Sequence, residues 1–168
     1  VLSDKNPIVY QITGHDEIEM GSKFSDAISK MNCDVEEIKL ASMDSLSVDD
    51  CEMIMILGPT KDYSKDEAQK VIDYLNAGGK AIIACEAYKS AQTDKPNFES
   101  ILETFGVKVA DGVVAENDTN FYSSQYGPFF TFANGSGSFA SGIDNYIIAP
   151  YAKGLQQANK DDSSITYT

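Results

Sequence analysis

Basic residues are scarce in this sequence. Among its 168 residues, 13 Lys plus Arg stand against 26 Asp plus Glu, which gives a formal net charge of −13. Nucleic-acid binding depends on a basic surface that neutralises phosphates, so we expect no nucleic-acid partner. The same negative field would repel anionic membrane surfaces and highly charged anionic substrates.

Long hydrophobic runs are missing as well. No segment approaches the ~20 consecutive apolar residues that a membrane-spanning helix needs. The sequence begins at Val1, without an initiator Met or a signal peptide, and stops at Thr168 in a β-prone stretch. We therefore expect a piece excised from a longer, membrane-anchored protein. Its length suffices for a full hydrophobic core, and we predict one α/β domain over residues 1–168.

Glycine-rich phosphate-binding motifs are absent. Neither GxGxxG nor GxxxxGK[ST] occurs in the sequence. A nucleotide or flavin site also needs backbone donors at a helix N-terminus, whereas Asp16, Glu17 and Glu19 would repel a phosphate. We therefore predict no cofactor. A phosphoacceptor receiver domain is excluded because Gly58 stands where its Asp would end the third strand.

Potential metal ligands are few. His15 is the single histidine, and the three cysteines show no CxxC spacing. One histidine with scattered carboxylates (Asp16, Glu17 and Asp62) is a weak zinc signature, because zinc sites usually carry several His or Cys ligands. We predict no metal site. We interpret Asp16, Glu17 and Glu19 as charges that lead into the first helix and complement its dipole.

Cys85 provides the one catalytic alternative. It ends an apolar segment where a nucleophile elbow would lie, and His15 and Glu86 would be the candidate partners. However, an elbow is flanked by small residues, usually glycine, and the sequence here reads Ala84-Cys85-Glu86-Ala87-Tyr88. We therefore interpret Cys85 as a structural cysteine packed in the core. A Cys-dependent hydrolase or amidotransferase-like enzyme using Cys85 and His15 stays the alternative.

The clearest structural pattern lies between residues 53 and 85. The apolar run Met53–Leu57 is typical of a strand that is buried on both faces. Ser64 and Glu67 have the spacing of a capping box, and a pair of glycines ends the helix that follows. Lys80–Cys85 is a second apolar segment. Strand, helix and strand over these lengths predict a right-handed βαβ unit.

The remaining segments alternate in the same way. Further strands are predicted at Ile8–Ile12, Asp34–Leu40, Val107–Val114 and Tyr146–Ala149, with helices around Ile28 and Ile101. The alternation predicts a three-layer αβα fold with a mostly parallel sheet, flavodoxin-like or class I glutamine-amidotransferase-like. Short connections favour the strand order 2-1-3-4. The predicted second strand, Asp34–Leu40, carries several charged residues, which suits a strand at the edge of the sheet.

Residues 116–145 break this alternation. They are rich in Asn, Ser and Gly, yet include seven aromatic residues, too many for a disordered linker. We predict an irregular aromatic-rich insertion within the domain. It either supplies extra core or presents aromatic rings to a sugar or protein partner. The aromatic residues are Phe121, Tyr122, Tyr126, Phe129, Phe130, Phe132 and Phe139.

A candidate binding site follows from the strand order. The loops after the first and third strands would lie side by side at the topological switch point of the sheet. Together they offer donors, acceptors and two glycines that permit close backbone approach, which suits a neutral polar ligand such as a sugar or a peptide. The alternative is that both loops are only turns and helix caps, with Lys61 paired to Asp16. The eight predicted residues are Gly14, His15, Asp16, Gly58, Pro59, Thr60, Lys61 and Asp62.

Six motifs together resemble a known family. A TGH-acid turn follows the first strand, and a GP-x-K-D-x-S-x-x-E turn follows the third. In this order they resemble the auxiliary extracytoplasmic component of ABC-type transport systems, which includes gliding-motility-associated proteins. The resemblance covers residues 8 to 157. The motifs are Tyr10–Glu17, Gly58–Ser64 with Glu67, Tyr74–Lys80, Phe105–Val107, Asp111–Val114 and Pro150–Leu155.

The resemblance implies a non-enzymatic binding or scaffolding domain. It would lie on the extracytoplasmic face of the bacterial cytoplasmic membrane, anchored by segments outside this sequence. Its partners would be the permease and ATPase subunits of an ABC transporter. A related fold occurs in glutamine-amidotransferase-like enzymes, which keeps the Cys85 alternative open.

Overall fold

The computed structural model describes residues 6–87, 94–133 and 146–158. The chain forms two compact units. Unit 1 comprises Val1–Glu86 and Thr93–Thr104, and unit 2 comprises Ala87–Gln92 and Phe105–Thr168. The single domain over residues 1–168 stays a prediction. Within the described ranges, no helix has both the length and the apolar character that crossing a membrane requires.

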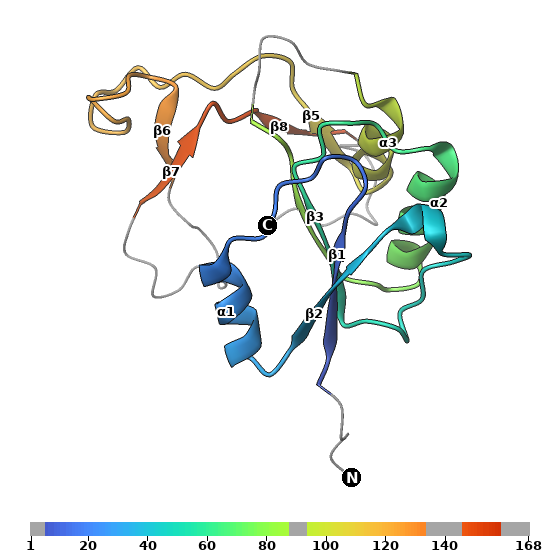
Figure 1. The fold of residues 1–168 in the computed structure, drawn as a ribbon. Helices are drawn as coiled ribbons and strands as arrows, with labels where there is room; N and C mark the ends of the chain where they lie inside the picture. The colour runs from blue at the N-terminus through green and yellow to red at the C-terminus, as the bar shows by residue number, and fades with distance from the viewer. Residues whose placement is uncertain (1–5, 88–93, 134–145, 159–168) are drawn as a thin grey trace. The chain divides into compact units, whose positions relative to one another are not determined.

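Unit 1 is built on a four-stranded parallel sheet (Figure 1). Its strand order is β2-β1-β3-β4, which confirms the predicted α/β class and the order 2-1-3-4. The charged strand β2 lies at an edge, as expected from its sequence. The strands are β1 (Ile8–Ile12), β2 (Asp34–Ile38), β3 (Met53–Leu57) and β4 (Ala81–Ala84).

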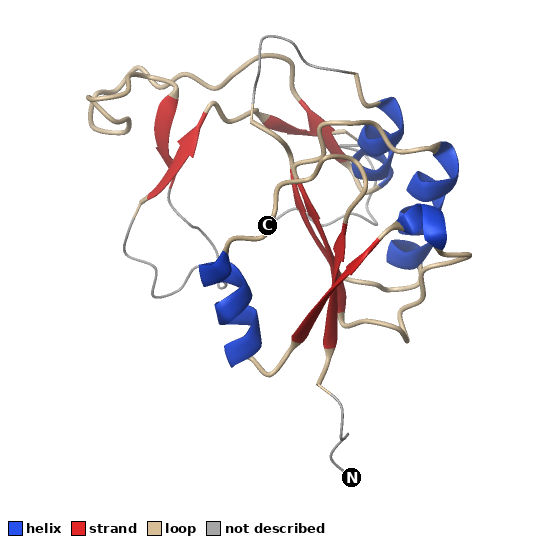
Figure 2. Cartoon of the chain, viewed as in Figure 1, coloured by secondary structure: helices blue, strands red, loops and turns tan. Residues whose placement is uncertain are grey.

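Three α-helices cover the two faces of this sheet. Helix α1 (Ser22–Lys30) lies on one side, and α2 (Lys65–Asn76) and α3 (Pro96–Thr104) lie on the other (Figure 2). A short 3-10 helix, η1 (Leu40–Ser42), follows β2. The three central side chains of β3 are fully buried between these layers, since Ile54, Met55 and Ile56 are all 0 % exposed.

The capping box of α2 forms as predicted. The Glu67 N–H donates to Ser64 Oγ (3.2 Å), and the Ser64 N–H donates to Glu67 Oε2 (3.0 Å). At the other end, Gly78 adopts a left-handed backbone with φ +94°, which glycine permits at little cost. Local sequence signals therefore determine both ends of this helix.

Helix α1 corrects one interpretation. It begins at Ser22 after Gly21, has no side-chain cap, and carries no acidic residue in its first turn. Asp16, Glu17 and Glu19 therefore do not complement its dipole, because that effect is confined to the terminal turn. The loop before α1 is longer than expected, and these acidic residues belong to the strand-end region instead.

The described residues of unit 2 form two antiparallel pairs of strands. Strand β5 (Val107–Val109) pairs with β8 (Leu155–Gln157), and β6 (Phe130–Ala133) pairs with β7 (Ile147–Pro150). The strand predicted over Val107–Val114 therefore ends at Val109. The prediction of a last core strand at Tyr146–Ala149 is wrong, because Ile147 and Ile148 in β7 are 56 % and 55 % exposed.

Aromatic rings of unit 2 stack on one another. Tyr126 lies on Phe130 with ring centroids 4.9 Å apart, and Phe129 lies on Tyr151 at 6.0 Å. Phe130 also meets the Tyr151 ring edge-on at 5.4 Å. Stacked ring pairs stabilise a fold by more than the burial of their apolar surface alone would. Phe139, the last aromatic residue of the predicted insertion, lies outside the described residues.

Candidate functional site

The loops after β1 and β3 lie together, as the strand order predicts. We call residues 13–17 and 58–62 the strand-end loops. The carbonyl of His15 in the first loop accepts hydrogen bonds from the N–H groups of Thr60 (3.0 Å) and Lys61 (3.1 Å) in the second. Gly58 makes this approach possible, because its φ of +59° disfavours other residues and a Cβ would lie 3.1 Å from Ile18. All eight predicted residues therefore lie in two loops that contact each other, with His15, Gly58 and Pro59 buried.

His15 is the centre of a buried polar cluster. Its Nδ1 lies 3.2 Å from Glu17 Oε1, and its Nε2 lies 3.3 Å from Glu67 Oε2. Its ring stacks on Tyr63 with centroids 3.9 Å apart and planes 12° apart. A neutral imidazole donates to only one of these carboxylates, whereas an imidazolium donates to both. Both ring nitrogens of His15 thus have partners within the protein.

Glu17 connects the cluster to its surroundings. The His15 backbone N–H (2.7 Å) and the Tyr63 hydroxyl (3.1 Å) donate to its carboxylate, whose side chain is 2 % exposed. Burial, followed by the charge of Glu17, raises the pKa of Tyr63 and keeps its hydroxyl protonated as a donor. Burial alone would raise the pKa of Glu67, but hydrogen bonds from Ser64 and interactions with His15 outweigh it and lower that pKa.

Two further predicted residues have partners inside unit 1. Asp62 accepts hydrogen bonds from the backbone N–H groups of Asn97 (3.1 Å) and Phe98 (3.0 Å), so it caps α3. Lys61 forms an ion pair with Asp16 (2.9 Å), and both side chains are more than half exposed. The contacts of the turn-and-cap interpretation are therefore present. Whether these loops bind a ligand stays a prediction.

The end of β4 carries the residues of the catalytic alternative. Cys85 is half-buried instead of packed in the core as expected, because β4 is the other edge strand of the sheet. Next to it, Glu86 forms an ion pair with Lys95, and these two residues are only 6 % and 5 % exposed. The nearby acid therefore has a buried cation as its partner.

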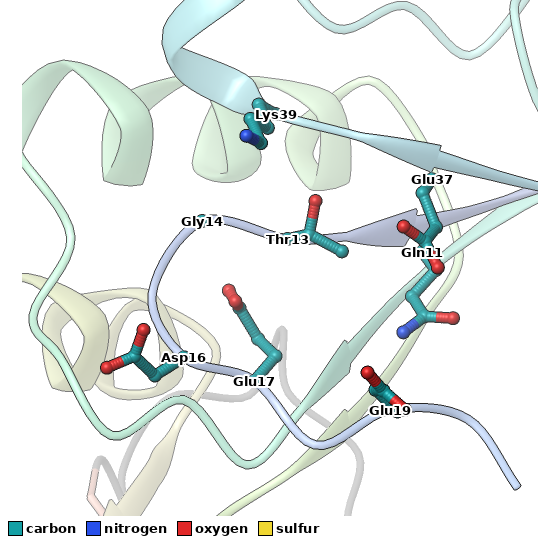
Figure 3. Close-up of a pocket in the computed structure, with 8 residues that line it drawn as sticks. All are labelled: Gln11, Thr13, Gly14, Asp16, Glu17, Glu19, Glu37 and Lys39. Atoms are coloured by element: carbon teal, nitrogen blue, oxygen red, sulfur yellow. The ribbon is translucent and has the colours of Figure 1, made fainter.

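A pocket of about 410 Å³ opens beside the strand-end loops (Figure 3). It lies at the carboxyl ends of β1 and β2, whereas the sequence pointed to β1 and β3. Gln11 lies on β1 and Thr13 directly after it, and Glu17 and Glu19 lie on the loop that curves past them. We call it the β1–β2 pocket. Its lining residues are Gln11, Thr13, Gly14, Asp16, Glu17, Glu19, Glu37 and Lys39.

Only Gly14 and Asp16 of the lining residues belong to the predicted site. The six that the prediction did not include are Gln11, Thr13, Glu17, Glu19, Glu37 and Lys39. A signal was present, because Gln11 interrupts the apolar strand Ile8–Ile12 and is a direct partner of Glu37 in the parallel register. Within the described residues, no group of three or more His, Cys, Asp or Glu side chains is arranged to hold a metal ion. The lining of the pocket is polar and acidic, because it includes four carboxylates and one ammonium group.

Comparisons with known proteins identify the fold and the family of this chain. None of the curated proteins compared with the chain matches it. The mmIFT52 N-terminal domain is similar in structure, with a TM-score of 0.65 over 89 % of this chain and 68 % of that one. Its 19 % sequence identity supports a shared α/β fold alone. The profile of the family described as "ABC-type uncharacterized transport system" matches residues 6–127. The chain therefore belongs to this family of auxiliary ABC transport components.

Proposed function

We propose that this chain is a non-enzymatic binding or scaffolding domain of an ABC transport system. It acts on the extracytoplasmic face of the bacterial cytoplasmic membrane, held there by membrane segments of its full-length protein. It contacts the permease, and through the permease it associates with the ATPase. The observation that carries the proposal is the family match over residues 6–127, which includes all four strands of unit 1 and both strand-end loops.

The contacts of the strand-end loops support binding over catalysis. A general base must lie within hydrogen-bond reach of the proton that it abstracts from a substrate. Here Glu17 and Glu67 occupy the two ring nitrogens of His15, and Asp62 caps α3. The polar groups therefore act on one another and hold the loops in place. A surface held in one conformation binds a partner with little loss of entropy.

The exposed part of the strand-end loops is the proposed contact surface. Gly14, Asp16 and Lys61 are exposed, and Thr60 and Asp62 are partly exposed. These residues combine one cation, two anions and accessible backbone. Such a surface suits a neutral polar ligand, such as a sugar or a peptide segment, or a polar face of the permease.

Co-purification from the native host tests the proposal. An affinity-tagged full-length protein should recover the permease and ATPase subunits. The double variant Asp16→Lys with Lys61→Asp keeps the ion pair but inverts its charge pattern. We expect it to lower recovery at least about tenfold, because like charges opposed across an interface cost several kcal/mol.

A matched control is available at the opposite end of the sheet. Glu52 and Lys80 form another exposed ion pair, just before β3 and β4. The swap Glu52→Lys with Lys80→Glu should leave recovery unchanged. Equal losses from both swaps would contradict the proposed surface, and failure of the wild type to recover any transporter subunit would contradict the function.

Protease protection tests the proposed location. In spheroplasts with an intact membrane, added protease should cleave the full-length protein within this domain. A cytoplasmic marker protein should stay intact in the same sample. Cleavage only after the membrane is permeabilised would place the domain on the other face.

A further inference from the structure

We propose that the β1–β2 pocket binds an organic cation through a guanidinium or ammonium group. The inference goes beyond the proposed function and does not depend on it. It concerns the ends of β1 and β2 and a charged ligand, whereas the predicted site at β1 and β3, which shares Gly14 and Asp16 with the pocket, suits a neutral one. All eight lining residues belong to unit 1.

Gln11 is the observation that points to a ligand. The residue is only 4 % exposed, and its side chain extends into the pocket (Figure 3). None of the described residues forms a hydrogen bond with its amide. The amide atoms still open onto the pocket, because no side-chain N or O atom closed off from solvent lacks a hydrogen-bond partner among the described residues. A ligand in the pocket would supply the missing hydrogen bond, and the Gln11 carbonyl oxygen is suited to accept it from a cation.

The charge of the pocket selects the sign of the ligand. Four carboxylates and one ammonium group line it. Lys61 neutralises Asp16, and Glu17 accepts hydrogen bonds within the His15 cluster. Glu19 and Glu37 form no ion pair with any described residue. An anion would be repelled, and a neutral ligand would leave the excess charge uncompensated, so a cation is favoured.

Size and donor number favour an organic group. A volume of about 410 Å³ falls within the range of small-molecule sites and exceeds what a bare metal ion needs. A guanidinium presents five donors in a planar fork that matches carboxylates, and an ammonium presents three. Acceptors from Gln11, Glu19 and Glu37 converge on the pocket from β1, β2 and the loop after β1. The cation is either a small free amine or guanidine, or the Lys or Arg side chain of a polypeptide.

Calorimetric titration of the 168-residue chain distinguishes these sources. The probes are argininamide, the blocked tripeptide acetyl-Gly-Arg-Gly-amide, and the same tripeptide with citrulline, which is neutral and nearly isosteric with arginine. We expect saturable binding of at least one arginine probe and none of citrulline. Binding of argininamide alone indicates a small-molecule site, and binding of the tripeptide indicates a site for a polypeptide side chain.

Two neighbouring glutamates provide a matched pair of variants. Glu37→Gln removes a pocket charge, whereas Glu36→Gln removes an exposed charge from the next position of β2, on the opposite face of the sheet. We expect Glu37→Gln to weaken binding about tenfold and Glu36→Gln less than about twofold. A third variant, Gln11→Met, should weaken binding while its thermal midpoint shows that the chain still folds.

Three results would overturn the proposal. The first is that neither arginine probe binds saturably, and the second is that citrulline binds as tightly as arginine. The third is that Glu36→Gln weakens binding as much as Glu37→Gln, since only the general negative field would then be acting. Ca²⁺ alone serves as an additional probe. Ca²⁺ binding that Glu37→Gln abolishes, without any binding of arginine, would identify a metal site instead.

Discussion

The two units of this chain achieve order in different ways. Every buried hydrophobic side chain of the described residues lies in unit 1. The same unit carries most of the charge, with nine Lys against twenty Asp plus Glu, whereas unit 2 has four against six. Unit 1 is therefore stabilised by burial, the dominant favourable term in folding. Such a core tolerates the self-repulsion of a strongly acidic surface.

Unit 2 depends on other interactions. Its described strands form two-stranded antiparallel pairs, which are marginally stable in isolation. Stacked rings such as Phe129 on Tyr151 join the β6–β7 pair to the residues around it. The difference teaches that one chain can use two sources of order. In unit 1 a packed core holds the strand-end loops in place, whereas unit 2 relies on backbone hydrogen bonds between paired strands and on ring stacking.

Truncating one strand isoleucine in each unit should show the largest contrast. Ile56→Ala in β3 removes a fully buried side chain and should lower the free energy of unfolding by about 2–5 kcal/mol. Ile148→Ala in β7 removes a half-exposed one and should cost less than about 1 kcal/mol. Denaturant unfolding of both variants measures the difference. Equal losses would show that β7 is packed as firmly as β3.

Removing His15 should have the next largest effect. His15→Ala removes one partner from each of the buried carboxylates of Glu17 and Glu67, and losing hydrogen bonds to buried charged groups costs about 1–3 kcal/mol. Lys61→Ala is the control from the same loops, because an exposed ion pair contributes about 0–1 kcal/mol. Equal unfolding midpoints for His15→Ala and the wild type would contradict a stabilising role for the cluster.

The N-cap of α2 should contribute less. Ser64→Ala removes the hydroxyl that accepts from the Glu67 N–H, with an expected loss of about 1 kcal/mol. Ser29→Ala, at an exposed position of α1, is the matched control and should change stability by less than about 0.5 kcal/mol. Thermal or denaturant unfolding reports both values, and identical results for the two variants would argue against the cap.

The smallest predicted effect is a pH dependence. The pKa of Glu67 in the folded protein is lowered from 4.5, so its contribution to stability is complete above that value. The contribution is lost as the pH falls through the folded pKa. Below about pH 5, wild-type stability should therefore fall more steeply than that of Glu67→Gln. Parallel stability curves for the two proteins would show that Glu67 gains nothing from its partners.

Much of unit 1 could be predicted from the sequence. The apolar run Met53–Leu57 and the Ser64–Glu67 capping box are local signals, and they determine β3 and the start of α2. Once the strand order is known, the neighbouring strand-end loops follow from it. The burial of His15 could not be predicted, because it depends on Glu67, which lies 52 residues away.

The β1–β2 pocket and the pairing in unit 2 needed the structure. The pocket depends on the register of Gln11 with Glu37 and on the path of the long loop before α1. In unit 2, the apolar stretch Tyr146–Ala149 predicts a strand but does not specify its partner. An antiparallel neighbour satisfies its backbone without burial, so a hydrophobic pattern alone did not distinguish a core strand from an exposed one.

Native-state amide hydrogen exchange of the 168-residue chain tests most directly whether the core of unit 1 holds the strand-end loops in place. We predict the slowest exchange in β1, β3 and α2, with comparable protection at Thr60 and Lys61, whose N–H groups donate to the His15 carbonyl. The amides of β6 and β7 should exchange at least about 100-fold faster. Rapid exchange at Thr60 and Lys61, or protection in β6 and β7 equal to that in β3, would contradict this account.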